Sequence, residues 1–109
     1  MKSDIMKDAD AFVRALKGTE EYKRFQMTKN RVKQFPELKA RIDEFRKMTF
    51  EMQNASENEN LMEDLELLQK QNESLLETPI VADFLQAELA FCRMMQKVNT
   101  HITEALDFE

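Results

Sequence analysis

The sequence predicts an all-α fold, an antiparallel hairpin or bundle of about five helices with an unusually long last helix. Three observations predict it. Apolar residues recur at three- and four-residue spacing through most of the 109 residues. One Gly and two Pro leave little to interrupt a helix, and β-branched residues, which favour strands, are sparse. The length predicts one helical domain over residues 1–109.

The first two helices are expected at residues 4–17 and 19–34. Gly18 stands where a residue in the left-handed conformation commonly ends a helix. Thr19 is expected to cap the second helix, because its hydroxyl can accept a hydrogen bond from a free backbone N–H. The first helix has one apolar face, formed by Ile5, Ala9, Phe12, Val13 and Leu16.

A third helix is expected at residues 36–54 and a fourth at residues 59–76. Pro36 disfavours helix in the residue before it but suits a first helical turn, so it begins the third helix. Residues 54–60 are polar and predict the loop of a helical hairpin.

The last helix, expected at residues 79–106 after Thr78 as cap and Pro79 in the first turn, is the predicted contact surface. At 1.5 Å per residue it is a rod of roughly 42 Å, longer than a compact domain of this size is wide. Its two adjacent apolar stripes are wider than one neighbouring helix can cover. We therefore expect a homodimer or higher homo-oligomer. The expected interface residues are Phe84, Ala87, Glu88, Phe91, Met94, Met95, Val98 and Ile102.

Charge is unevenly distributed. Residues 1–54 contain 13 Lys+Arg and 9 Asp+Glu, whereas residues 55–109 contain 3 and 12. Either the basic half folds against the acidic half, or the basic half binds nucleic acid or an acidic protein. Tyr22 and Phe25 can stack bases, although their helical spacing with Val32 favours core packing. The candidate basic patch comprises Arg14, Lys17, Lys23, Arg24, Lys29, Arg31 and Lys33.

No residue set suited to catalysis, metal binding or cofactor binding emerges, so we expect a protein that is not an enzyme. His101 is the only histidine and is expected at a helix surface or interface. Cys92 is the only cysteine, which fits a reducing cytoplasm, and is expected to be buried as a small hydrophobe. Core packing is also expected for Met48, Met52, Met62, Met94 and Met95.

The N-terminus lacks the apolar segment of a secretory signal. The longest uninterrupted apolar run, Leu89 to Cys92, is far too short to cross a membrane. Both observations predict a cytoplasmic protein without membrane insertion.

Several blocks resemble the YlbF/YmcA family, in order and over nearly the whole chain. The first half contains Glu-Glu-Tyr-Lys at residues 20–23, Phe-Pro-Glu at 35–37 and Asp-Glu-Phe-Arg-Lys-Met at 43–48. The second half contains Thr-Pro-Ile-Val at residues 78–81, Phe-Leu-Gln-Ala-Glu at 84–88 and Gln-Lys-Val-Asn at 96–99.

The resemblance implies helical hairpins, commonly oligomeric, in cytoplasmic proteins of low-GC Gram-positive bacteria. Founding members of the family form a complex that influences competence, sporulation and biofilm formation and promotes mRNA processing by a membrane-anchored endoribonuclease. The chain is at least as similar to the YheA-like branch, whose function is unknown. The complex of the founding members is associated with iron–sulfur clusters, which need several thiolates. This chain has only one cysteine, Cys92, so we expect no cofactor.

The sequence thus predicts a non-catalytic adaptor or regulator that acts by protein–protein contact. RNA or nucleoprotein binding through the basic helices, and a purely structural helical oligomer, are the alternatives.

Overall fold

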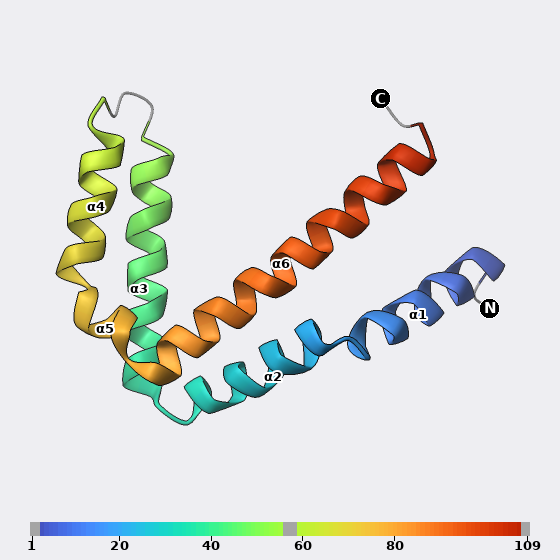
Figure 1. Cartoon of the computed structure of the whole chain (residues 1–109), viewed down its shortest axis with the longest axis horizontal. Coiled ribbons are helices and arrows are strands. Elements are labelled where there is room, and N and C mark those ends of the chain that lie inside the picture. The colour runs from blue at the N-terminus through green and yellow to red at the C-terminus, as the bar shows by residue number, and fades with distance from the viewer. Residues whose placement is uncertain (1–2, 56–58, 108–109) are drawn as a thin grey trace.

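The computed structural model describes residues 3–55 and 59–107. Within them the chain is all-helical, and the long C-terminal helix is present as predicted (Figure 1). There are six described helices rather than five. They are α1 Asp4–Lys17, α2 Glu20–Lys33, α3 Pro36–Gln53, α4 Leu61–Gln71, α5 Glu73–Glu77 and α6 Pro79–Ala105.

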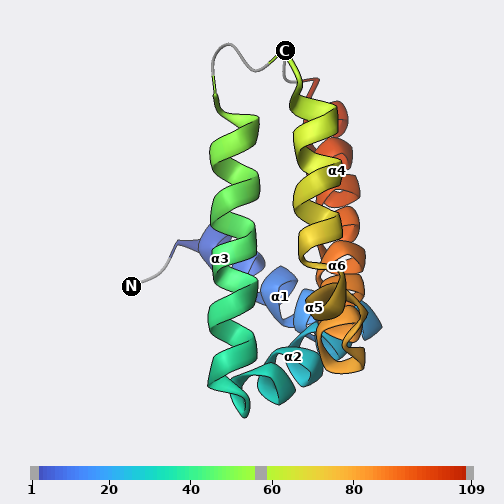
Figure 2. The same cartoon turned by 90° about the vertical axis from the view of Figure 1, so that its left-hand side faces the viewer.

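The helices form two antiparallel hairpins that diverge from a common vertex. One hairpin pairs α3 with α4, and the other pairs α2 with the first half of α6 (Figures 1 and 2). Helix α1 continues beyond α2 along the second arm (Figure 1). Each hairpin joins a helix from the basic half to one from the acidic half, as the first interpretation of the charge pattern predicted. The predicted antiparallel hairpins are therefore present, and they form two arms.

The hydrophobic core lies at the vertex, where α2, α3, α5 and α6 meet. Its buried side chains are at most 7% exposed. They are Val32, Ile42, Leu75, Val81 and Phe84, and we call this set the vertex core.

Away from the vertex the protein is open. Its radius of gyration is 17.9 Å, whereas a compact chain of this length would have about 13 Å. In α1, whose residues are all described, no side chain is buried. Much of the apolar pattern seen in the sequence is therefore not buried within one chain.

The junction between α1 and α2 differs from the prediction at Gly18. Its φ of −85° and ψ of −6° are right-handed, not left-handed. The chain needs no reversal here, because Thr19 is extended and α2 continues away from α1 (Figure 1). Thr19 caps α2 as predicted: its Oγ1 accepts a hydrogen bond from the Tyr22 N–H at 3.2 Å.

The single helix predicted at residues 59–76 is two helices, separated at Asn72. The Asn72 side-chain amide donates to the Leu68 carbonyl at 2.8 Å, which competes with continued helical hydrogen bonding. Part of the predicted loop at residues 54–60, namely 56–58, lies outside the described residues.

Thr78 occupies the N-cap position of α6, but its hydroxyl does not cap that helix. The hydroxyl instead donates to the carbonyl of Ser74, in the first turn of α5, at 2.9 Å. Pro79 stands in the first turn of α6 as predicted, where a missing N–H costs no helical hydrogen bond.

Candidate contact faces and a basic pocket

The first half of the predicted interface on α6 packs against other helices of the same chain. Phe84 and Ala87 are buried. The Phe91 ring stacks on Phe25 with a centroid distance of 5.3 Å. Glu88 forms an ion pair with Arg46 of α3. These side chains are used in contacts within the chain. The part of the predicted contact surface that remains available to another chain is the second half of α6.

That second half has no comparable cover. Met94, Met95 and Val98 are half-buried, and Ile102 is 44% exposed. On the other side of the arm, α1 leaves Ile5 71% exposed. We call these surfaces the distal faces. They comprise Ile5, Phe12 and Val13 of α1 and Met94, Met95, Val98 and Ile102 of α6.

The residues of the candidate basic patch lie along α1 and α2. Lys29 and Lys33 line a pocket, whereas the other five residues of the patch are exposed along α1 and α2. Phe25 lies against Phe84 and Phe91, and Tyr22 meets Phe91 edge-on at 5.9 Å. Phe25 therefore packs against the vertex core, as its helical spacing predicted, whereas Tyr22 packs on Phe91 beside it.

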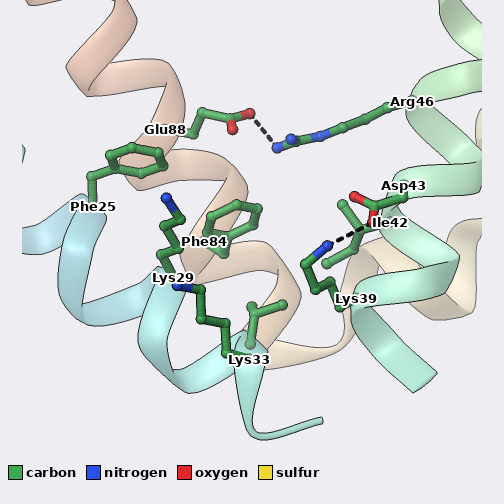
Figure 3. A pocket seen from close by; sticks show the side chains of 10 residues that line it. Phe25, Lys29, Lys33, Lys39, Ile42, Asp43, Arg46, Phe84 and Glu88 are labelled. Carbon is green, nitrogen blue, oxygen red and sulfur yellow. Dashed lines mark hydrogen bonds and ion pairs between the residues drawn. The ribbon is translucent and has the colours of Figure 1, made fainter. Parts of the chain in front are cut away.

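The pocket lies between α2, α3 and α6 near the vertex and has a volume of about 240 Å³ (Figure 3). Two phenylalanines and two aliphatic side chains line it together with four cations and two carboxylates. The lining residues are Phe25, Lys29, Val32, Lys33, Lys39, Ile42, Asp43, Arg46, Phe84 and Glu88.

Both carboxylates of the pocket are already paired. Lys39 Nζ lies 2.8 Å from Asp43 Oδ2, and Arg46 holds Glu88. The Arg46 guanidinium also lies 5.2 Å from the centre of the Phe84 ring, a cation–π contact. Lys29 lies over the Phe25 ring at 5.9 Å. Neither Lys29 nor Lys33 forms an ion pair with the described residues.

Sequence reasoning missed the contributions of Lys39 and Arg46 to this pocket. Neither residue stands near Lys29 or Lys33 on the same helix, so no local spacing links them. Only the turn at Pro36, which sets α3 against α2 and α6, brings the four cations together.

Three smaller expectations can also be compared with the structure. Cys92 is exposed, so its predicted burial is wrong; it points to a side of α6 away from Ala87, which faces the core. His101 is exposed, as expected of a helix-surface residue. Of the five methionines assigned to the core, Met62 is exposed and the other four are only half-buried, because the arms diverge around them.

None of the described helices has the length and apolar character needed to cross a membrane. Within the same described residues, no cluster of three or more His, Cys, Asp or Glu side chains has the arrangement of a metal site.

Comparison with known proteins gives a consistent picture. Residues 5–107 match the family model described as control of competence regulator ComK, YlbF/YmcA. The chain is 30% identical over 108 residues to a UPF0342 protein of Symbiobacterium thermophilum, covering 93% of this chain and 92% of that one. It is 29% identical over 101 residues to a UPF0342 protein of Staphylococcus haemolyticus, covering 91% and 89%. No solved structure gives a significant match.

Proposed function

The chain belongs to the YlbF/YmcA family, and we propose that it is a non-catalytic regulator that binds other proteins as a homodimer. The family's description, control of a competence regulator, supports the regulatory role. The exposed distal faces support action by protein contact.

The observation that carries this proposal is the contrast between the amphipathic pattern of α1 and its lack of cover. Isolated short helices are only marginally stable in water, and most helical stability in proteins comes from packing of an apolar face. Helix α1 has such a face, yet Ile5, Phe12 and Val13 are exposed. Exposed apolar side chains along one helix face support a protein contact site.

A second copy of the chain is a suitable cover for α1. Its first turns carry Asp4 and Asp8, and its last turn carries Arg14 and Lys17. In an antiparallel pair of α1 helices, the acidic end of one therefore lies beside the basic end of the other. A two-fold axis perpendicular to α1 gives this antiparallel arrangement, with the same patch used by both subunits.

The distal half of α6 can enter the same dimer. The last turns of α6, which carry the exposed Ile102, extend past the end of α2 on the same arm as α1 (Figure 1). Two α1 helices and two distal α6 segments would then form an intermolecular bundle, with the α3–α4 hairpins at its outside.

By family resemblance, those partners belong to an RNA-processing or developmental regulatory complex. The test is affinity capture from the native host with mass spectrometry, using wild type, Ile102→Asp and the control Phe50→Asp. Phe50 is an exposed aromatic residue on α3, outside the distal faces. We expect wild type and Phe50→Asp to retain the endoribonuclease or other regulators.

The Ile102→Asp variant should retain less of these proteins if the dimer is the binding form. Capture of RNA with no enriched protein would contradict the proposal and favour the nucleic-acid alternative. Failure to enrich any partner above a tag-only control would also contradict it.

A further inference from the structure

We propose that the pocket between α2, α3 and α6 binds a small organic anion with a compact apolar body, of the class of aryl phosphates and aryl carboxylates. This inference does not depend on the proposed dimer, since the pocket is formed within one chain.

The pocket's size limits the ligand. Its volume is about 240 Å³. Apolar cavities of about 150 Å³ accept a benzene molecule, and drug-sized ligands occupy about 300–1,000 Å³. The pocket therefore suits one ring with one acidic group, and it is too small for a nucleotide cofactor.

The pocket's lining favours a ligand with two different ends. Val32, Ile42 and Phe84 belong to the buried vertex core and give the pocket an apolar base. Lys29 and Lys33 lie along the α2 wall, across the pocket from Lys39 and Arg46 of α3 (Figure 3). An apolar body can displace water from the base while an acidic group binds the ammonium groups.

Internal charge neutralisation does not account for these two lysines. The carboxylates of Asp43 and Glu88 are each already bound to a cation of α3. Lys33 lies in the last turn of α2, where the helix dipole favours a positive charge. The same is true of Arg31, which does not line the pocket. The position of Lys29 and Lys33 at one cavity is thus the feature that indicates an anion.

The ligand would contact both arms of the molecule. The pocket wall formed by Lys39, Ile42 and Arg46 belongs to α3, whereas the other walls belong to α2 and α6. A bound anion would link the two hairpins and stabilise the folded state, by an amount that rises with the logarithm of its concentration above the dissociation constant. It could thereby fix the angle between the arms, which sets the geometry offered to partners.

The test is an NMR titration of the full chain with three probes: phenyl phosphate, inorganic phosphate and benzyl alcohol. We expect saturable binding of phenyl phosphate, with shift changes centred on Lys29, Lys33 and Phe84. Inorganic phosphate lacks the ring and benzyl alcohol lacks the charge. Each should bind at least about ten-fold more weakly, since each loses one set of contacts.

Two variants and one control test the site. Lys33→Glu and Lys29→Met should each weaken phenyl phosphate binding about ten-fold or more, because a charge-assisted contact is lost. Lys29→Met keeps most of the side-chain stem over Phe25. Arg31→Glu makes the same charge change as Lys33→Glu on the opposite side of α2 and should bind like wild type. Circular dichroism confirms that each variant is folded.

Several results would overturn the proposal. Undiminished binding by both Lys33→Glu and Lys29→Met would show that the lysines are not used. Equal weakening by Arg31→Glu would indicate only general charge attraction. Equal affinity for inorganic phosphate would show that the apolar base is not occupied, and the absence of saturable phenyl phosphate binding would contradict the site itself.

Discussion

The vertex core and the distal faces have the same helical pattern of apolar residues, but only the vertex core is buried. At the vertex, apolar residues from four helices are at most 7% exposed. In the distal faces, apolar residues at similar helical spacing are exposed: Ile5 is 71% exposed and Ile102 is 44% exposed. The difference lies in whether neighbouring helices are present. An amphipathic pattern thus predicts a face that should be covered, but not which chain covers it.

The largest expected effect is at the vertex, with Leu75→Ala. Leu75 is fully buried among α2, α3 and α6, so its truncation should lower the free energy of unfolding by about 2–5 kcal/mol. Chemical denaturation measures this loss. Leu67→Ala on the exposed side of α4 is the control and should change stability by less than about 0.5 kcal/mol. Similar losses for the two variants would break the comparison.

The next largest effect is expected for Phe12→Asp in the distal faces, and it concerns dimer formation. We expect the dissociation constant of the dimer to rise at least about 30-fold, as for a hot-spot residue worth about 2 kcal/mol. Sedimentation equilibrium over a range of concentrations measures this change. Because Phe12 is outside the vertex core, thermal unfolding of the resulting monomer should still be cooperative. Phe50→Asp is the matched control and should leave the association constant unchanged.

A smaller effect is expected for Arg46→Ala, which removes both the ion pair to Glu88 and the contact with the Phe84 ring. The pair is partly exposed, so solvent screening limits the loss of stability to about 1 kcal/mol. Lys39→Ala, which breaks an exposed pair within α3, should cost about 0.3–0.5 kcal/mol. Guanidinium unfolding of both variants would show whether Arg46 ties the two arms together. A smaller loss for Arg46→Ala than for Lys39→Ala would argue against that role.

The smallest effect is expected for Gly18→Ala between the two regions. Gly18 has a negative φ, and an added Cβ would lie 3.4 Å from the Ala15 carbonyl oxygen, an ordinary contact. Alanine should therefore stabilise the fold by about 0.4–1 kcal/mol by restricting the unfolded chain. A loss of stability in thermal melts would show that the α1–α2 junction needs glycine after all.

Helix boundaries could be predicted where they depend on local chemistry. Thr19, Pro36 and Pro79 stand at the starts that their side chains favour. The break at Asn72 was missed because Asn72 stands at helical spacing between Leu68 and Leu75, and its bond to the Leu68 carbonyl is visible only in three dimensions.

The candidate sites could be predicted only in part. The width of the apolar arc on α6 indicated more than one neighbour, but not that α2 would take the first half at Phe84 and Phe91. The pocket is lined by residues from three helices. The clustering of basic residues in the sequence therefore indicated Lys29 and Lys33 but not Lys39 or Arg46. Residues far apart in sequence become one site only through the tertiary fold.

We propose that a second copy of the chain covers the distal faces. Sedimentation velocity of wild type beside Ile102→Asp and Phe50→Asp tests it most directly. The chain has a mass of 12.9 kDa. We expect wild type and Phe50→Asp to sediment with twice that mass and Ile102→Asp to shift toward the single-chain mass. A wild-type protein at the single-chain mass at all concentrations, or an Ile102→Asp variant that remains fully dimeric, would contradict the account.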